Sequence, residues 1–155
     1  MKFKFKYRDQ VEDTVTGVKG VVIGVHQWNN GCVRYSIQRM PEKGETPPPA
    51  DLFDEQDLSM LDEASTPIVT DDIFKFGFLD DVRDVISGYK GKVLCRTYWN
   101  GYMARYAIQG KAEKGKAPPD MYRVDEQELT LLKAAAKPKA KPAGGPRNDE
   151  RRGLR

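Results

Sequence analysis

Hydrophobic and polar residues alternate along short stretches of this chain, and turn residues separate the stretches. Val33, Tyr35 and Ile37 are spaced by two among polar neighbours, which places them on one face of a β-strand. A β-branched run over residues 21–28 precedes them. Asn29-Asn30-Gly31 stands between the two runs and is a hairpin signal, because Asn and Gly tolerate positive φ. Residues 32–40 are therefore predicted to return antiparallel to 21–28.

The flanking residues complete the same plan. Residues 11–15 alternate as a first short strand and a tight turn follows at 16–20. Beyond the hairpin come a Pro- and Gly-rich loop at 41–50, a short segment at 52–53, a polar turn at 54–56 and a last strand at 58–61. Four to five short strands in about 60 residues, with a one-turn helical step before the last, are typical of an SH3-like small barrel.

The whole pattern occurs twice. Residues 3–61 align with 74–132 without a gap, and 26 of the 59 positions are identical, against about 6% expected by chance. The chain is thus divided into repeat 1 (1–61), an acidic linker with one proline (62–73), repeat 2 (74–132) and a tail (133–155). We predict an all-β fold of two tandem SH3-like small barrels with about five short strands each, followed by a disordered or extended basic tail.

Charge is distributed unevenly over this plan. The whole chain has a formal net charge of +3, but the tail alone carries +6, so residues 1–132 are slightly acidic. The tail has almost no large apolar side chain to bury, which is typical of a disordered or extended segment. Its basic residues are predicted to contact an acidic surface or nucleic acid: Lys133, Lys137, Lys139, Lys141, Arg147, Arg151, Arg152 and Arg155.

The residues needed for catalysis or for metal binding are not grouped in this sequence. His26 is the only histidine, and its counterpart in repeat 2 is Thr97, so we interpret it as an ordinary strand residue. Cys32 and Cys95 align with Met103 and Gly24 and read as small apolar residues at tolerant strand positions. No nucleophile has an evident base and no glycine loop cradles a phosphate. We therefore expect no enzyme activity, catalytic residue, cofactor, metal or small-molecule substrate.

The two copies also allow an internal comparison of polar and aromatic positions. The following residues are identical in both copies and are the predicted binding residues: Trp28, Asn29, Arg34 and Gln38 in repeat 1, and Trp99, Asn100, Arg105 and Gln109 in repeat 2. A hairpin-tip Trp beside Arg and Gln on one strand face would form a stacking and hydrogen-bonding patch. The alternative is structural: Arg34 packs over Trp28 and pairs with Asp54 or Glu55.

The acidic pairs Asp54-Glu55 and Asp125-Glu126 have two interpretations of their own. As neighbours in a turn they position the last strand of each repeat, and otherwise they contribute to partner binding.

Two resemblances follow from these motifs. Residues 9–22, with Asp13-Thr14-Val15-Thr16-Gly17 at their centre, resemble the KOW-type opening of SH3-like domains. The wider pattern, through Asn29-Asn30-Gly31 and Arg34-Tyr35 to Phe53-Asp54-Glu55-Gln56, is similar to small uncharacterised proteins encoded by tailed bacteriophages, which carry one copy and often a Gly-Gly-Pro tail like residues 144–146. The resemblance covers both repeats. It implies an SH3-like fold, and the two copies imply that the number of binding sites differs from that of a one-copy protein. KOW domains as a class bind RNA or proteins.

Three functions remain open at this point. The first is a bivalent adaptor, which docks on a protein partner through both barrels while the cationic tail contacts an acidic surface or nucleic acid. The second is a KOW-like protein that binds RNA or DNA. The third is a virion component whose tail lies across neighbouring subunits. No apolar stretch approaches the roughly 18 residues of a membrane span, and residues 1–6 do not resemble a signal peptide. We expect no membrane contact and a cytoplasmic location, in the bacterial host for a phage protein.

Overall fold

Short antiparallel strands make up nearly all of the regular structure. The computed structural model describes residues 2–67, 70–99 and 103–137. In repeat 1 the strands are β1 (Gln10–Asp13), β2 (Lys19–Trp28), β3 (Val33–Gln38), β4 (Asp51–Asp54) and β5 (Leu58–Asp62). In repeat 2 they are β6 (Asp81–Asp84), β7 (Lys90–Trp99), β8 (Met103–Gln109), β9 (Tyr122–Asp125) and β10 (Leu129–Lys133). The predicted all-β class is confirmed.

Three one-turn 3-10 helices accompany the strands in the described residues. Two of them, η1 (Glu55–Asp57) and η3 (Glu126–Glu128), stand just before the last strand of each repeat, where the sequence predicted a helical step. The third, η2 (Asp71–Ile73), lies in the predicted linker. The described part of the chain contains no helix long and apolar enough to cross a membrane.

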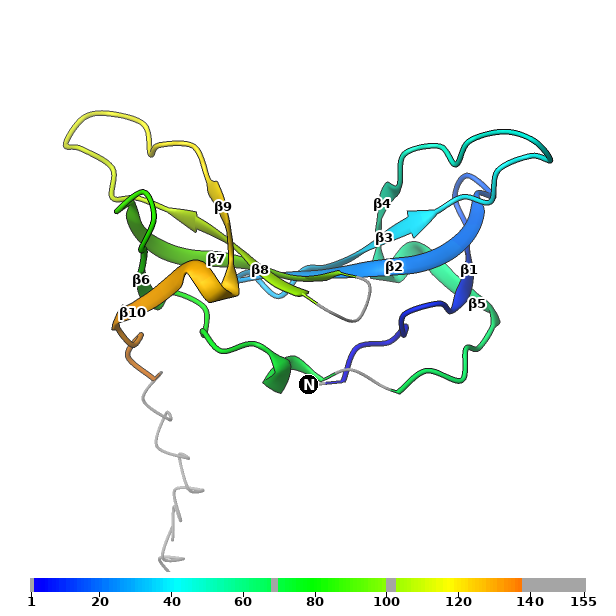
Figure 1. Ribbon diagram of the computed structural model, residues 1–155, viewed down its shortest axis with the longest axis horizontal. Coiled ribbons are helices and arrows are strands. Elements are labelled where there is room, and N and C mark those ends of the chain that lie inside the picture. Colours follow the sequence, from blue (N-terminus) through cyan, green and yellow to red (C-terminus); the bar gives the residue numbers. More distant parts are fainter. Residues whose placement is uncertain (1, 68–69, 100–102, 138–155) are drawn as a thin grey trace, which may run out of the picture.

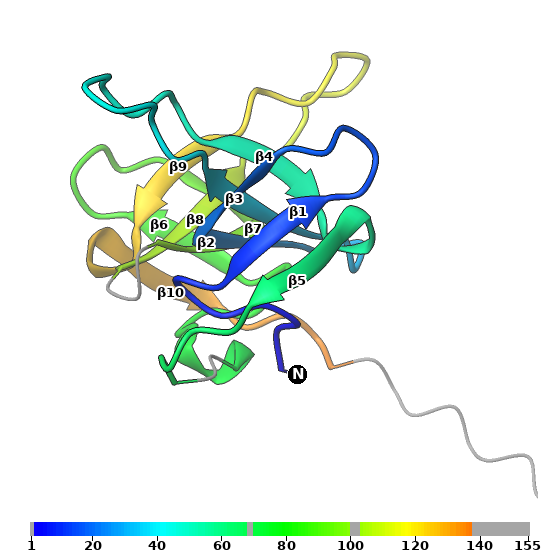
Figure 2. The ribbon, with the colours of Figure 1, turned by 90° about the vertical axis from the view of Figure 1, so that its right-hand side faces the viewer.

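The prediction of two tandem SH3-like small barrels is not confirmed, because the sheet is not closed. All ten strands belong to one open sheet, with β10-β6-β7-β2-β1-β5 along its main path, and β3-β4 and β8-β9 attached to β2 and β7. Figure 1 shows the result as two lobes joined by a shared central ribbon, and Figure 2 shows how the strands of one lobe curve around its interior. In the part of the chain that the structure describes, the edges β4 and β5, and likewise β9 and β10, do not pair with each other, and part of β2 pairs with part of β7 to join the repeats.

This shared ribbon relates the repeats by an approximate two-fold axis. Residues 24–28 of β2 run antiparallel to 95–99 of β7, with Val25 beside Tyr98 and His26 beside Thr97. His26 and Thr97 are 71 positions apart in sequence, which is the offset between the repeats, so each is the other's equivalent. An antiparallel pair in which equivalent residues face each other has a local two-fold axis at that point.

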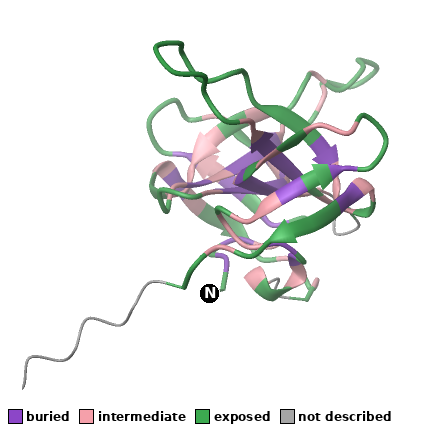
Figure 3. Ribbon diagram, turned by 90° about the vertical axis from the view of Figure 1, so that its left-hand side faces the viewer, coloured by how far each residue is buried: buried purple, intermediate pink, exposed green. Residues whose placement is uncertain are grey.

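Each lobe has an apolar interior beneath its strands. Tyr35 and Tyr106 are almost completely buried and make edge-on ring contacts with Phe5 and Phe76, at 5.2 and 5.3 Å between centroids. The Phe5 and Phe76 segments precede β1 and β6 and lie on the same side of the sheet in both repeats. Figure 3 shows the buried residues gathered inside the strands while the long loops are exposed.

On the core side of the pairing between β2 and β7 lies Arg96, a buried residue that was not among the predicted site residues. The Arg96 guanidinium lies over the rings of Phe74 and Phe78, 4.7 and 4.2 Å from their centroids, and donates a 2.5 Å hydrogen bond to Gln27 of repeat 1. Burial lowers the pKa of Arg96. The equivalent residue in repeat 1 is Val25, so the two-fold symmetry is not exact here.

The C-terminal end of the second repeat extends a little further than expected. β10 includes Lys133, which was predicted as the first tail residue, and the Ala135 amide donates a 2.8 Å hydrogen bond to Asp80. In repeat 1 the Ala64 amide bonds Asp9 in the same way, also at 2.8 Å. Lys137 is described and exposed, and the remaining predicted tail contacts, from Lys139 to Arg155, lie outside the described residues.

Candidate binding face

One face of the shared ribbon carries most of the predicted binding residues of both repeats. In β3, Tyr35 points into the core, so Arg34, Ser36 and Gln38 point to the opposite side. Cross-strand partners share a face, which adds residues of β2, β4, β7 and β9. We call this surface the central face. Its residues include Gly24, His26, Trp28, Arg34, Ser36, Gln38, Leu52, Asp54, Cys95, Thr97, Trp99, Arg105, Ala107, Gln109, Arg123 and Asp125.

The central face is framed by structure contributed equally by both repeats. The long loops at 39–50 and 110–121 rise at its two ends, on the side away from the N-terminal segment (Figure 1). Gln38 anchors the first loop by donating a 2.5 Å hydrogen bond to the Pro48 carbonyl, and Gln109 donates a 2.8 Å bond to Pro119 in the second. The retained glutamines therefore position the loops around the face.

His26 forms the floor at the two-fold axis. One ring nitrogen, Nδ1, lies 3.0 Å from the Thr97 hydroxyl, and Nε2 lies 2.7 Å from the Ser36 hydroxyl. The Trp99 ring meets the imidazole edge-on, with centroids 5.2 Å apart. Burial and then the positive charge of Arg123 lower the pKa of His26 to about 4. The imidazole is therefore neutral at pH 7 and helps to join the repeats, within a strand as predicted.

The tryptophans lie at the junction and not at free hairpin tips. Trp99 stands opposite Gly24, so close that a Cβ on Gly24 would lie 2.9 Å from the Trp99 ring. Trp28 pairs with Cys95 in the same register, and both indoles are half-buried. The Asn29 amide donates to the Leu94 carbonyl of the other repeat at 2.9 Å. Asn100 lies outside the described residues.

The arginines form ion pairs within their own repeats. Arg34 Nε lies 2.6 Å from Asp54 Oδ1, and Arg105 Nε lies 2.5 Å from Asp125 Oδ1. The hydrogen bond and charge of Asp54 raise the pKa of Arg34. The pairing that the structural interpretation expected is thus present in both copies. Side chains of Arg34 and Arg105 remain 43% and 48% exposed, so they are also available to a partner.

The neighbouring glutamates tie the 3-10 turns to the core. Tyr35 donates a 2.7 Å hydrogen bond to Glu55, and Tyr106 donates to Glu126. Burial, with the adjacent carboxylate, raises the pKa of both tyrosines well above the usual range. Each hydroxyl also accepts a backbone amide, Phe5 or Phe76, at 3.3 Å. The acidic pairs therefore position the step into the last strand, as one interpretation predicted.

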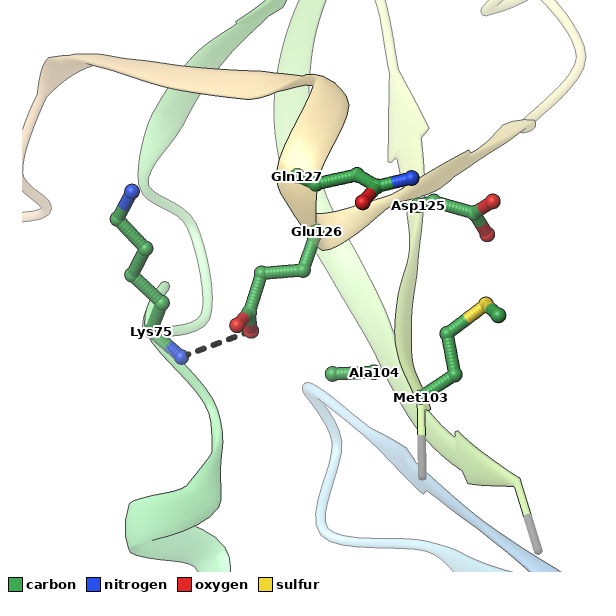
Figure 4. A pocket seen from close by; sticks show the side chains of 6 residues that line it. All are labelled: Lys75, Met103, Ala104, Asp125, Glu126 and Gln127. Carbon is green, nitrogen blue, oxygen red and sulfur yellow. Dashed lines mark hydrogen bonds between the residues drawn. The ribbon is translucent and has the colours of Figure 1, made fainter. Parts of the chain in front are cut away.

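Two equivalent pockets lie beside these turns, one in each repeat. The pocket in repeat 1 has a volume of about 300 Å³ and is lined by Gly31, Cys32, Val33, Arg34, Asp54, Glu55 and Gln56. Its counterpart, of about 320 Å³, is lined by Lys75, Met103, Ala104, Asp125, Glu126 and Gln127. Figure 4 shows the six lining residues of this pocket, with the Glu126 carboxylate turned toward the Lys75 backbone amide, from which it accepts a 3.1 Å hydrogen bond. We call these the paired pockets.

The described residues hold no group of three or more histidine, cysteine or acidic side chains placed to bind a metal ion. Comparison with models of known protein families, with curated proteins and with solved structures finds no match for this chain. The geometry of the central face is therefore the basis for the function proposed below.

Sequence reasoning missed two exposed residues of the central face. Leu52 and Arg123 are equivalent positions on β4 and β9 that differ between the copies, and the search for identical residues passed over them. Their side-chain direction was readable from strand alternation, counted from Asp54 and Asp125. Both are exposed.

Proposed function

We propose that this protein is a non-enzymatic bivalent adaptor that docks on a protein partner through the central face, while its cationic tail contacts an acidic surface or nucleic acid. The observation that supports this most is the antiparallel pairing of β2 with β7. It turns two copies of one residue set into a single surface with approximate two-fold symmetry.

The chemistry of the surface favours binding. Tryptophan and arginine are enriched among the residues that dominate binding energy at protein interfaces, and here Trp28, Trp99, Arg34 and Arg105 stand half-exposed on one face. Ion pairs hold the two arginines in place, and the pairing of β2 with β7 holds the two tryptophans. Because little side-chain freedom is left to lose, the ordering cost of association is low.

The duplication itself favours a bivalent function. A partner that contacts both halves at once gains from the fixed spacing, since the second contact forms within the complex. One sheet carries both halves, so the spacing is set by strand pairing and does not depend on the linker at 62–73. The paired pockets add an equivalent recess beside each half.

We also propose a fold class for each repeat and a source for the protein. Each repeat has five short strands and a one-turn helix before the last strand, as in the SH3-like units that the sequence resembles. We infer that each repeat is an open member of that class, in which pairing with the other repeat replaces closure. The resemblance to small phage proteins supports a phage origin and a place in the bacterial cytoplasm.

The test is capture of partners from a lysate of the native host, with and without nuclease, followed by mass spectrometry. The informative variant is Leu52→Glu with Arg123→Glu, which adds negative charge at both equivalent exposed positions of the central face. The matched control is Val15→Glu with Ile86→Glu. These are also equivalent, each is 75% exposed, and both lie in the turns that follow β1 and β6.

We expect the same protein to be captured by the wild type and the control, with or without nuclease, and to be lost with the central-face variant. Equal capture by both variants would reject the central face as the docking surface. Capture that disappears with nuclease and falls steeply with salt would support the nucleic-acid function, since Arg34, Arg105 and Arg123 share the face with two indoles.

A further inference from the structure

Repeat 2 has a pocket lined by two tyrosines whose counterparts in repeat 1, Val18 and Asp51, are not aromatic. It lies between the turn after β6 and the start of β9, has a volume of about 580 Å³ and is lined by Ser87, Gly88, Tyr89, Pro119, Asp120, Met121 and Tyr122. Tyr122 and Arg123 are neighbours on one strand and point to opposite sides of it. The pocket is therefore separate from the central face.

The difference between the repeats is coordinated over several positions. In repeat 1, Arg39 forms a 2.9 Å ion pair with Asp51. The equivalent positions in repeat 2 are Gly110 and Tyr122, so the ion pair is replaced by a glycine and an aromatic ring. Two further changes go the same way, from Val18 to Tyr89 and from Ala50 to Met121. This part of repeat 2 is therefore more apolar than the equivalent part of repeat 1, which holds the Arg39–Asp51 ion pair.

The polar ends of the two tyrosines are already held by the protein. The Gly110 amide donates a 3.0 Å hydrogen bond to the Tyr89 hydroxyl, and a Cβ on Gly110 would lie 2.9 Å from that oxygen. The Tyr122 hydroxyl donates to Asp84 at 3.3 Å. The rings meet edge-on with centroids 5.4 Å apart. Glycine at 110 thus leaves room for a fixed tyrosine pair.

The pocket remains open to solvent. Met121 and Tyr122 are 43% and 42% exposed, although both are large and apolar. Fixed aromatic rings with exposed faces are the surface on which extended, proline-containing segments dock, because proline rings pack on them and the segment is already ordered. Asp120 at the rim adds a negative charge that favours a segment with lysines.

We propose that this pocket binds the proline- and lysine-containing part of the chain's own C-terminal tail. That part is Lys137-Pro138-Lys139-Ala140-Lys141-Pro142-Ala143-Gly144-Gly145-Pro146. Its prolines can pack on the tyrosine rings and on the methionine. Its lysine ammonium groups can contact Asp120 and the faces of the tyrosine rings. The tyrosine pair occurs in repeat 2 only, so this binding surface is not a general property of the repeated fold. This inference does not rest on the proposed function.

The tail is long enough to reach the pocket. The register places Lys133 beside Asp81 and Leu129 beside Asp84, so the chain leaves the sheet about three strand residues, or ~10 Å, from the end of β6. The pocket begins at the turn just beyond. An extended proline-containing segment advances about 3.1 Å per residue, so residues 138–146 span about 28 Å. The chain can therefore reverse its direction and place Pro142 or Pro146 in the pocket.

The experiment uses the full chain and a carbodiimide, which joins a lysine amine to a carboxylate that it contacts. Cross-linked peptides between Asp120 and Lys139 or Lys141 are quantified by mass spectrometry, and a mixture of ¹⁴N- and ¹⁵N-labelled protein separates links within one chain from links between chains. We expect these links in the wild type, within one chain.

Two variants test the pocket and the prolines separately. Tyr89→Val with Gly110→Arg and Tyr122→Asp gives repeat 2 the residues with which repeat 1 folds, and leaves the net charge unchanged. Pro138→Ser with Pro142→Ser and Pro146→Ser keeps every tail lysine and lies beyond the described fold. We expect the link to Asp120 to fall about tenfold in each, which corresponds to a loss of about 1.4 kcal/mol of binding.

Three results would overturn the proposal. Undiminished links in the proline variant would show that charge alone attracts the tail. Undiminished links in a pocket variant that unfolds at the wild-type temperature would show that the tyrosines are not the binding surface. Links found only between chains would show that another copy's tail, or a chance encounter, supplies the lysine. If the pocket variant fails to fold, the proline variant still decides.

Discussion

Acidification should weaken the junction between the repeats through a single side chain. His26 is buried at the two-fold axis with both ring nitrogens bonded to hydroxyls, and its pKa is lowered to about 4. In the unfolded chain its pKa is about 6.5. The folded state therefore favours the neutral imidazole. As the pH falls below about 6.5 the unfolded chain binds a proton that the folded protein does not, so stability decreases until the pH reaches about 4 and is constant below it.

The expected size of this effect follows from the difference between the two pKa values. A difference of about 2.5 units corresponds to about 3.4 kcal/mol in full. By about pH 5 the loss is about 2 kcal/mol, while most carboxylates are still ionised. The positive charge of Arg123 contributes in the same direction as burial, because it opposes a second cation nearby.

The measurement is urea unfolding of the wild type and His26→Gln between about pH 7.5 and about pH 5. Glutamine does not titrate, so the variant is expected to be less stable at pH 7.5 and to lose about 2 kcal/mol less than the wild type on acidification. His26→Thr, which places the repeat 2 residue at the axis, should behave likewise. Parallel stability curves for wild type and both variants would refute the assignment of the pH dependence to His26.

Two substitutions and one labelling experiment test the packing described above. Gly24→Val should cost about 1–3 kcal/mol in urea unfolding because its Cβ would displace the Trp99 ring, 2.9 Å away, and an unchanged midpoint would contradict the close contact. Tyr35→Phe should cost about 1–3 kcal/mol because the buried Phe5 amide loses its acceptor; wild-type stability would show that another group replaces it. The Cys95 thiol, whose pKa is raised by burial, should react with a thiol reagent only at the rate of unfolding; rapid modification in native buffer would show that it is accessible.

The local elements of each repeat could be predicted from the sequence because their causes are local. Alternation around Tyr35 separates core from surface on β3, and the two polar turns at 55–57 and 126–128 form the predicted helical steps. The duplication could also be recognised, since it is a direct property of the sequence. Strand alternation also placed Arg34 and Gln38 on one face of their strand.

The pairing of the two repeats could not be predicted in the same way. β2 and β7 are 71 positions apart, and strand periodicity shows which side chains face a core but does not show which backbone edges will meet. Because this pairing was not foreseen, Trp28 and Trp99 were expected at two separate hairpin tips. The aromatic pocket was also missed, because it depends on positions such as Gly110 that differ between the copies, whereas identical residues were sought.

The junction between β2 and β7 also determines how the protein behaves on dilution and during synthesis. A single repeat made alone would expose the backbone of residues 24–28, an unpaired edge that other chains could join. A complex of two separate chains would hide that edge only above its dissociation constant. In one covalent chain the second repeat is always present at a high local concentration. The paired surface therefore persists at any protein concentration, and a ribosome stalled before β7 leaves an aggregation-prone edge.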